Sequence, residues 1–437
     1  MMTTLILAAA LAVPGEAELK AQLPGIFAKS AAHYKALDAA ATPLRKGEMS
    51  NRRGRHNSDM YVPHGWKKWK TGKDELDMRP IYWWTAGHYP GSLWYLYEAT
   101  GDEFFKARAT DWTAILAPNS IVDDNHDVGF IVFCSFGNAR RLLKTDKYDA
   151  ILAETAASLS KRYSESLGLI RSWGALDEKK DFLVIPDNMM NLELLEAVSK
   201  LGRRASCPSL GADANGRDAR CPSDFDRIAR SHADMTMKHH FRADGGTYHV
   251  LNYDQRPGFL GTVQEIRRGQ GHSCETAWSR GQSWAIYGYT MMYRETKDPA
   301  YLAFAQKVSD FAINHPNMPA DGVPYWDYGA PGEERDTSAA SIMASGLLEL
   351  AGFVGGEKGT AYRAFAVKQL LSLASPDYFS EGDEIGHFLL KHGVGNKPGG
   401  SEIDTPLNYG DYYFLEALLR FERSRTKQTP KHKGDVK

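Results

Sequence analysis

Asp187 lies at the point where an apolar run stops and a helical pattern begins. Pro186 and Asn188 flank it, and from Met189 onward apolar residues recur at helical spacing. An Asp at such a boundary is first of all an N-cap, which accepts a hydrogen bond from the first turn of the helix. The arrangement returns along the chain, because polar residues open one long helix after another. This repetition indicates a shared site in addition to capping.

The polar residues at these helix starts are of the types that bind and cleave sugars. They include carboxylates, tryptophans, histidines and an arginine, with no nucleophile motif and no phosphate-binding loop. Arg can hold the carboxylate of an acidic sugar at two points. Paired acids such as Asp127 and Asp187 are what glycoside hydrolysis requires, with one of them kept protonated near neutral pH. The stretches are Trp83–Gly91, Asn125–Phe130, Pro186–Asn188, Trp278–Trp284, Arg335–Ser338 and Asn408–Asp411, and loops at Trp173 and His249–Tyr253 could add walls.

Simpler roles are open to several of these residues when each is taken singly. Asp127 and Asp187 could be plain N-caps, and that is the role that we expect for Asp336 and Asp411. Arg280 could bind a helix C-terminus or a structural carboxylate. The convergence of the helix starts therefore predicts a polar pocket, most simply one for a sugar, and no single reaction.

About a dozen helical patterns position these residues. Helices joined by short turns run antiparallel, so every second helix starts at the same end of the molecule. The short joints at Tyr97–Asp102, Leu143–Tyr148 and Tyr293–Asp298 resemble one another, which is a degenerate repeat of helix pairs. The patterns cover about residues 18–41, 90–99, 103–116, 128–143, 147–165, 188–201, 223–241, 277–295, 299–314, 336–353, 359–373 and 409–423.

One helix of each pair is apolar nearly all round, as at 341–350, which indicates an inner ring of helices wrapped by an outer one. The prediction is an all-α (α/α)6 barrel, a six-hairpin toroid, as one domain over residues 18–425 with a polar tail at 426–437. An open superhelical solenoid is the alternative. Strand-like runs are few and short, such as Thr247–Tyr253, and the polar stretch Thr42–Pro80 reads as a lid or a rim.

Composition and termini limit the remaining possibilities. The 437 residues are 43% hydrophobic and carry a formal charge of −1, with no basic domain, so nucleic acid is not an expected partner. Residues 1–17 form an apolar stretch that ends in the small-x-small triplet Gly15–Ala17 but has no basic residues before it. We read 1–17 as a possible signal peptide and predict export to the periplasm or medium, with the cytoplasm as the alternative. No later stretch is long and apolar enough to span a membrane.

Four cysteines add a hint about the compartment. Cys207 and Cys221 flank a Gly-, Asp- and Arg-rich insert and could close it as a disulfide, which would suit an oxidising environment. Neither has a second Cys or a His at ligand spacing, so no metal site is predicted there. Cys134 and Cys274 are expected to be buried free thiols.

Taken together and in order, the motifs resemble the unsaturated glucuronyl hydrolases, glycoside hydrolase family 88. Each motif is weak alone, but the set covers the chain from about Trp83 to Phe421. The matching pieces are Trp84–Trp94, His126–Phe130, Pro186–Glu193, Trp278–Trp284, Asp321–Asp327, Ser401–Asp404 and Tyr409–Tyr413.

The resemblance implies an (α/α)6 barrel without metal or cofactor that hydrates a double bond. The substrate would be an oligosaccharide, left by a polysaccharide lyase, with a 4,5-unsaturated uronic acid at its non-reducing end. The acid that matches Asp187 would protonate C4 and help water to add at C5, and the neighbouring Asp127 would help to keep that proton available. The hemiketal then opens and expels the rest of the sugar. A monomer or homodimer is expected.

The resemblance also implies substrate-binding positions. In the Gly393–Ser401 stretch, where members meet the second sugar, Lys397 and Ser401 form a possible outer subsite. Lys397 would touch a sulfate or a carboxylate there, or else be solvated. The segment Lys46–Met78 and the insert between Cys207 and Cys221 look additional to the family pattern. The positions that would hold the unsaturated sugar are Trp84, His126, Trp173, His249, Gln270, Arg280 and Trp284.

Three other functions remain open on the sequence. An N-acylglucosamine-epimerase-like isomerase would share the fold but would favour paired histidines, where this chain places Asp. An unsaturated rhamnogalacturonyl hydrolase would share both fold and chemistry. A sugar-binding toroid without catalysis would not need Asp187 for turnover. The sequence leaves open the parent polysaccharide, for which chondroitin, heparin, hyaluronan, ulvan and xanthan are all candidates.

Overall fold

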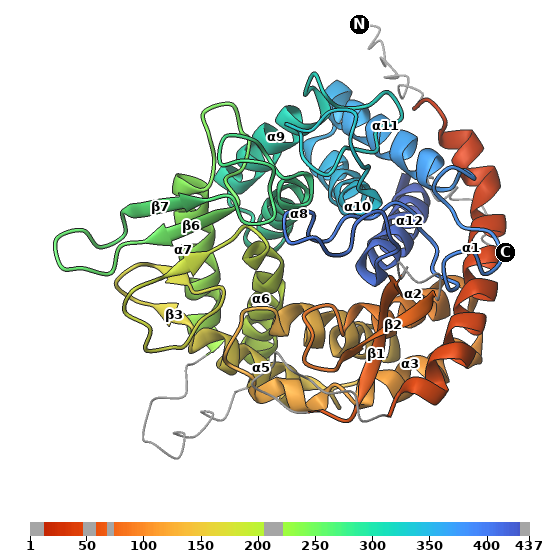
Figure 1. Cartoon of the computed structure of the whole chain (residues 1–437), viewed down its shortest axis with the longest axis horizontal. Coiled ribbons are helices and arrows are strands. Elements are labelled where there is room, and N and C mark those ends of the chain that lie inside the picture. The colour runs from red at the N-terminus through yellow and green to blue at the C-terminus, as the bar shows by residue number, and fades with distance from the viewer. Residues whose placement is uncertain (1–12, 47–57, 68–73, 205–221, 429–437) are drawn as a thin grey trace, which may run out of the picture.

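The protein forms two concentric rings of helices around one axis (Figure 1). The computed structural model describes residues 13–46, 58–67, 74–204 and 222–428. Within these ranges the inner ring consists of α2 (His88–Thr100), a π-helix η3 (Gly129–Gly137) with α4 (Asn138–Leu143), α6 (Asn188–Arg204), α8 (Ser279–Thr296), α10 (Thr337–Val354) and α12 (Asn408–Gln428). The outer ring consists of α1 (Glu16–Ala41), α3 (Glu103–Ala114), α5 (Asp149–Ser160), α7 (Pro222–His239), α9 (Pro299–Ile313) and α11 (Gly356–Leu373).

The inner ring is closed. Each inner helix packs against the next, from α2 through η3, α6, α8 and α10 to α12, and α12 packs back against α2. Nearly every residue of α8 and α10 is buried, because these helices contact the outer ring on one side and each other on the other. The predicted (α/α)6 toroid is confirmed, and the open solenoid is excluded by the contact between the last inner helix and the first.

The first helix of the chain completes the outer ring. On α1, the Tyr34 hydroxyl donates to Asp411 of α12 at 3.1 Å. At its start, Glu16 accepts a 2.6 Å hydrogen bond from Arg363 of α11. Cleavage after Ala17, at the predicted signal-peptide boundary, would remove the first residues of α1 together with this ion pair. Residues 1–12 lie outside the described part of the chain.

The predicted joints between paired helices have a common local structure. Gly101, Lys144 and Lys297 each end a helix in the left-handed conformation, with φ of 69°, 50° and 60°. Asp102 and Asp298 then cap the next helix by accepting a backbone hydrogen bond at 2.9 Å. This repeated turn reverses the chain and brings every second helix back to the same end.

The helix predicted at 128–143 is only partly right, because Gly129–Gly137 forms a π-helix before α4 begins. The wider turn faces α6, where the Asn191 side-chain oxygen accepts the Phe130 N–H at 2.9 Å. A Cβ at Gly129 would lie 2.4 Å from the same oxygen, so only glycine allows this approach. A π-helix has the same apolar composition as an α-helix, and π-turns are frequent at functional sites.

Short strands surround the helical rings. The polar stretch Thr42–Pro80 contains an antiparallel pair, β1 (Tyr61–Lys67) and β2 (Glu75–Pro80), which the sequence reading missed because β1 is buried on both faces and shows no alternation. The predicted helix at 147–165 ends at Ser160, after which β3 (Tyr163–Ser164) pairs with β4 (Leu169–Ile170). A third sheet has the order β5 (Leu183–Val184), β6 (Val250–Tyr253), β7 (Val263–Arg267), and β6 lies within the predicted strand. One 3-10 helix follows α1 (η1, Thr42–Leu44) and another follows α3 (η2, Ala117–Ile121).

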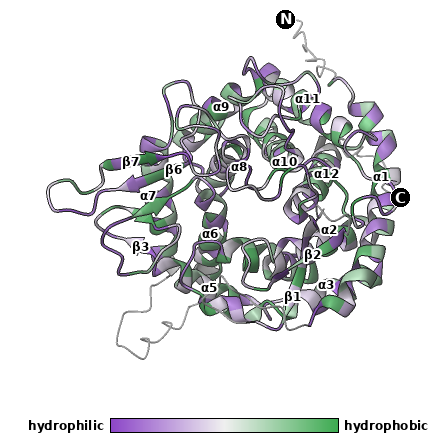
Figure 2. Cartoon of the chain, viewed as in Figure 1, coloured by the Kyte–Doolittle hydropathy of each residue, from purple (hydrophilic) through white to green (hydrophobic). Residues whose placement is uncertain are grey.

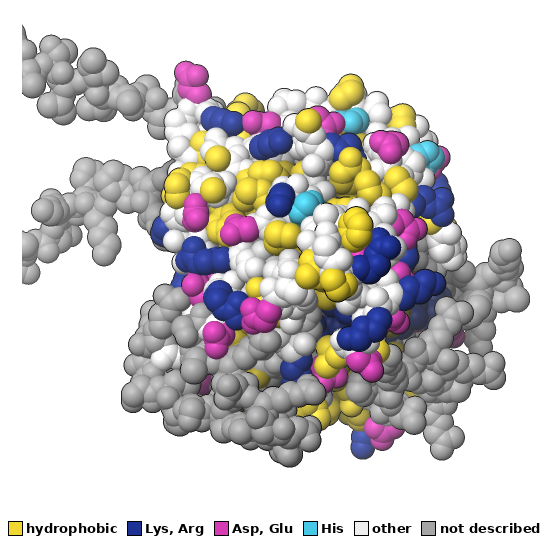
Figure 3. All heavy atoms as spheres, turned by 90° about the vertical axis from the view of Figure 1, so that its left-hand side faces the viewer, with side chains coloured by type: hydrophobic (Ala, Val, Ile, Leu, Met, Phe, Trp, Pro, Cys, Tyr) yellow, Lys and Arg dark blue, Asp and Glu magenta, His cyan; other side chains and the backbone are white. Residues whose placement is uncertain are grey.

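Apolar residues concentrate where the rings meet, and charge of both signs covers the outside. Apolar and polar residues alternate around the outer helices in Figure 2. The face that carries the β6–β7 hairpin mixes basic, acidic and hydrophobic side chains (Figure 3). Of the helices described, α10 alone is long and apolar enough to cross a membrane by composition, but it is 78% buried as a core helix of the barrel.

The thiols follow the prediction in part. Cys134 is buried, as predicted. Cys274 is only partly buried, since it lies in the loop before α8 with its thiol toward the Ile266 carbonyl. Cys207 and Cys221 lie outside the described residues.

Candidate active site

The polar helix starts meet at one end of the barrel. Asp127 directly precedes η3, Asp187 directly precedes α6, and Arg280 lies in the first turn of α8. The loop before Asp127 is joined to the Trp173 loop by a bridge between Asn125 and Trp173. The loop around residue 249 leads into β6, which pairs with the strand β5 just before Asp187. Residues far apart in the sequence thus gather at one end of the barrel.

Asp127 and Asp187 form a coupled pair of carboxyl groups. Burial raises the pKa of Asp127 to about 8, and repulsion from Asp187 adds to this shift. Burial raises the pKa of Asp187 to about 6, although Arg280 and the indole N–H of Trp284 act in the opposite direction. Because the two groups interact, these values belong to the pair. Near neutral pH the pair therefore carries one proton between two carboxyl groups.

Two histidines flank the acids as neutral imidazoles. His126 Nε2 lies 3.3 Å from Asp127 Oδ1, and His249 Nε2 lies 3.9 Å from Asp187 Oδ1. Burial lowers the pKa of both histidines to about 3. Each ring can therefore donate or accept a hydrogen bond, for example with a sugar hydroxyl, without carrying charge.

Aromatic rings form an apolar layer beside the acids. The Trp84 ring lies 4.9 Å from Tyr409 and 5.6 Å from Phe130, and Phe130 lies 5.2 Å from Trp284. Trp173 is 38% exposed, at the outer side of the His126 ring. Flat rings of this kind offer stacking surfaces to the C–H faces of a sugar.

Arg280 already has partners in the structure. Its guanidinium pairs with Asp336 at 3.3 Å, donates to the Val394 carbonyl, and donates to the Gly395 carbonyl at 2.7 Å. Gln270 donates to the same Gly395 carbonyl at 2.8 Å. The alternative of a structural carboxylate partner therefore applies to Arg280, which together with Gln270 fixes the loop at residues 394–395.

Several buried polar atoms at this end have no hydrogen-bond partner. Buried polar groups are normally paired, so a concentration of unpaired ones indicates the place of a polar ligand or water. Asn191 is one that the sequence reading did not single out, although its i+4 spacing from Asp187 places both on one face of α6. The atoms are Asp187 Oδ1, His126 Nδ1, Asn191 Nδ2, His249 Nε2 and Arg280 Nε.

The two carboxylates that were expected to be N-caps differ. Asp336 caps α10, accepting from the Ser338 N–H at 3.0 Å, as predicted. Asp411 does not cap α12, so that prediction is wrong. It lies within the first turn and accepts the backbone N–H groups of Leu389 and Leu390 at 2.9 and 3.0 Å.

The predicted outer-subsite residues lie on a hairpin beyond the acids. Lys397 donates to Glu333 at 2.6 Å and also pairs with Glu334. Ser401 is exposed, and its backbone pairs with Asn396 across the hairpin. The charge of Lys397 is thus compensated by two glutamates before any ligand arrives.

Known proteins of similar sequence and architecture show the family of this chain. An unsaturated glucuronyl hydrolase of Formosa agariphila is 42% identical over 344 residues, which cover 77% of this chain and 79% of that protein. An unsaturated chondroitin disaccharide hydrolase of Streptococcus pyogenes is 33% identical over 77% of this chain and 81% of that protein. The crystal structure of an unsaturated glucuronyl hydrolase specific for heparin has a TM-score of 0.77 and 37% identity, covering 92% of this chain and 98% of the other. No family model matches the chain.

The chain belongs to the unsaturated glucuronyl hydrolases. This family is glycoside hydrolase family 88, so the protein is a glycoside hydrolase with the family's (α/α)6 barrel.

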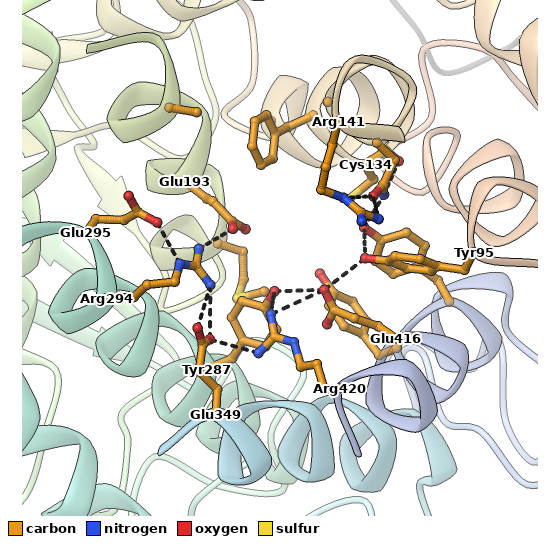
Figure 4. Close-up of a pocket in the computed structure, with 18 of the residues that line it drawn as sticks. Tyr95, Cys134, Arg141, Glu193, Tyr287, Arg294, Glu295, Glu349, Glu416 and Arg420 are labelled. Carbon is orange, nitrogen blue, oxygen red and sulfur yellow. Dashed lines mark hydrogen bonds and ion pairs between the residues drawn. The ribbon is translucent and has the colours of Figure 1, made fainter. Parts of the chain in front are cut away.

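A cavity of about 1020 Å³ lies inside the ring of inner helices of this glucuronyl hydrolase. Gly129, Phe130 and Met190 line it near the starts of η3 and α6, whereas its charged lining residues belong to later turns of the inner helices. Charged side chains ring it and point toward one another (Figure 4). Arg294 contacts Glu193, Glu295 and Glu349, while Arg420 contacts Glu349, Glu416 and the Tyr287 hydroxyl.

The groups around that cavity satisfy one another. Glu416 accepts from Tyr95 at 2.8 Å, from Tyr287 at 3.1 Å and from Ser345 at 2.6 Å. Among the lining residues, all of which the structure describes, none has a buried polar side-chain atom without a partner. The cavity therefore lacks the unpaired groups that characterise the catalytic end. Elsewhere in the described residues, no group of three His, Cys, Asp or Glu side chains is placed to hold a metal ion.

Proposed function

We propose that this hydrolase removes a 4,5-unsaturated uronic acid from the non-reducing end of acidic oligosaccharides produced by polysaccharide lyases. The observation that carries the proposal is the coupled pair Asp127 and Asp187, which shares one proton beside unpaired polar atoms. Family membership supports the same substrate class, since relatives act on unsaturated glucuronyl and chondroitin disaccharide substrates.

The chemistry follows from the polarisation of the enol ether. C4 is electron-rich, so a proton from Asp187 adds there and leaves positive charge at C5, shared with the ring oxygen. Water adds at C5 and returns its proton to the Asp187 carboxylate. The resulting hemiketal opens and the remaining sugar leaves. Asp187 thus ends the cycle in the state in which it began.

Asp127 and the neighbouring rings support this step. The negative charge of one carboxylate makes loss of the shared proton harder, so the pair holds a proton at the pH where Asp187 must donate it. His126 and His249 act as neutral hydrogen-bonding groups toward sugar hydroxyls. Trp84, Trp173 and Trp284 provide the stacking surfaces.

The outer subsite suits a leaving sugar without sulfate at the position facing Lys397. A sulfate there would have to compete with Glu333 and Glu334 for the ammonium group. We propose unsulfated glycosaminoglycan disaccharides as the preferred substrates. We also propose export to the periplasm or medium, supported by the apolar leader in the sequence. N-terminal sequencing of protein from cell fractions tests the latter.

The direct test follows the ultraviolet absorbance of the conjugated C=C bond in a panel of unsaturated disaccharides. The panel contains chondroitin, sulfated chondroitin, heparin, ulvan and rhamnogalacturonan products, each assayed with the wild type and with Asp187→Asn. We expect the wild type to consume the signal, the variant to leave it, and unsulfated members to react fastest. Persistence of the signal with every member would refute the proposed reaction. Equal loss with both proteins would remove Asp187 as the acid.

A further inference from the structure

Arg162 is a buried cation that the reaction above does not use. It lies just after α5 and is 2% exposed. Its Nε donates to the Arg171 carbonyl at 2.8 Å, Nη1 to the Asp123 carbonyl at 2.6 Å, and Nη2 to the Gly174 carbonyl at 3.1 Å. All three acceptors are backbone carbonyls and not carboxylates. A guanidinium fork can hold three such groups in one fixed arrangement.

These carbonyls belong to the two loops that carry site residues. Asp123 begins the loop that ends at Asp127, while Arg171 and Gly174 flank Trp173. The loops also touch directly, because the His126 N–H donates to the Ser172 carbonyl at 2.9 Å. Arg162, buried beneath both loops, therefore joins them through their backbone carbonyls.

The charge of Arg162 also acts on the catalytic pair. It works against the rise in the pKa of Asp127 and helps to keep the pKa of His126 low. Burial and the neighbouring Arg171 disfavour the charge on Arg162, whereas Asp123, Asp124 and Asp127 favour it. Even so, the pKa of Arg162 falls only to about 10, so the side chain remains charged at neutral pH.

We propose that Arg162 is a positioning residue of this hydrolase, which clasps the Asp127 loop to the Trp173 loop and places a fixed positive charge behind the acid pair. The inference rests on the proposed roles of Asp127 and Trp173. Small displacements of catalytic groups are costly, so a residue that fixes two walls of the pocket influences the rate without touching substrate.

Two substitutions separate the clasp from the charge. Arg162→Met removes both, while Arg162→Lys keeps the charge but cannot reach three carbonyls at once. We expect kcat to fall about 10- to 100-fold in each, since misplacement of about 1 Å can cost that much. The high-pH limb of the kcat/KM profile should move to higher pH in Arg162→Met alone, because Asp127 then loses a nearby cation and gives up its proton less readily.

Arg171 offers a matched control. It is equally buried and holds the same loop, donating to the carbonyls of Ala175 and Glu178 at 3.0 and 2.9 Å. Its charge is not among those acting on Asp127. Arg171→Met should therefore leave the high-pH limb in place. Movement of the limb in Arg171→Met equal to that in Arg162→Met would overturn the electrostatic role.

Amide hydrogen exchange without substrate tests the clasp independently of turnover. Both Arg162 variants should exchange faster at the amides of His126 and Ser172, and Arg171→Met should not do so at His126. If the wild type fails to act on any unsaturated disaccharide, the proposed function fails while this measurement still decides the clasp. If Arg162→Met does not fold, Arg162→Lys decides: wild-type kcat together with wild-type exchange would overturn the proposal.

Discussion

The two ends of the barrel use buried charge in opposite ways. Around the large cavity, Arg294 and Arg420 contact four glutamates, and one of these, Glu416, accepts from two tyrosines and a serine as well. At the catalytic end, Asp187 Oδ1, Asn191 Nδ2 and His249 Nε2 have no partner. The same helices run through both ends. One end is complete without a ligand, and the other is not.

The difference argues against the cavity around Arg294 and Arg420 as the active site. Stable packing pairs every buried charge, whereas catalysis needs groups that stay unpaired until substrate binds. Burial is the main cause of the raised pKa values of Asp127 and Asp187, and repulsion from Asp187 adds to the shift of Asp127. Substitutions at the catalytic end should therefore lower kcat without lowering the free energy of unfolding. Substitutions at the far end should lower the free energy of unfolding and leave kcat nearly unchanged.

The largest effect is expected from Asp187→Asn. The variant should lose about 10²- to 10⁴-fold in kcat, the usual contribution of general acid catalysis. Burial raises the pKa of Asp187 above its ordinary value of 3.8, so the folded wild type loses stability as pH rises and the carboxyl group ionises. At pH 8 the variant should then be about 1–3 kcal/mol more stable, given about 1.4 kcal/mol per pKa unit. Urea unfolding measures this, and a less stable variant would contradict the comparison.

At the far end, Glu416→Gln should show the opposite pattern. The charged acceptor for Tyr95, Ser345 and Arg420 is lost, so the free energy of unfolding should fall by about 2–3 kcal/mol. The kcat should stay within about twofold of wild type, because one aromatic layer separates this network from the acids.

A surface ion pair provides the control for Glu416. Glu165 and Arg227 pair at 2.8 Å but are 60% and 47% exposed. Glu165→Gln should change stability by less than about 1 kcal/mol. A comparable loss in both variants would show that the far-end network contributes no more than a surface pair.

The shared proton predicts a bell-shaped pH profile. We expect kcat/KM to be highest between the two pKa values of the pair, about 6 and about 8, and to fall about tenfold per pH unit outside them. In Asp127→Asn the coupling disappears, so the remaining limb should reflect Asp187 alone. A profile that is flat from pH 5 to pH 9 would show that the pair does not titrate in turnover.

A smaller effect than at Asp187 or Glu416 is expected at a residue of neither end. Glu196 is buried on α6, both carboxylate oxygens lack a partner, and burial raises its pKa to about 8 with a contribution from Asp226. Stability should fall as pH rises from 4.5 to 8, because the folded state must release a proton that it holds more tightly than the unfolded chain does. Glu196→Gln should remove this slope and gain about 1–2 kcal/mol at pH 8.5. Thermal unfolding of both proteins at pH 4.5 and 8.5 measures this pH dependence of stability. The kcat of Glu196→Gln should be unchanged.

The toroid was predictable because its signals are local. Repeated joints, such as that ending at Gly101 and restarting at Asp102, mark each reversal of the chain. Short and long connections alternate along the chain, so counting the helices shows that every second helix starts at the same end. The position of Asp127 and Asp187 at that end follows. These features depend on neighbours in the sequence.

The sequence reading missed features that depend on residues far away in the chain, because neighbouring residues give no sign of such partners. The π-helix depends on Asn191 of another helix, and the role of Asp411 depends on the backbone at Leu389. Arg162 lies inside the helix predicted at 147–165, and its neighbours in the sequence do not indicate that it binds two loops. Lys397 looked like a free cation because its glutamate partners lie more than sixty residues earlier. Pairing across the fold decides each of these cases.

The closure of the inner ring by α12 has a consequence for synthesis. This helix supplies Tyr409 to the aromatic layer and fills the gap between α10 and α2, yet it follows all the other described helices in the chain. Contacts between α2 and α12 join residues more than three hundred positions apart, as in the hydrogen bond between Tyr95 and Glu416. A nascent chain therefore remains an open crescent with exposed apolar edges until α12 emerges. A premature stop before α12 should yield neither a closed barrel nor a working enzyme.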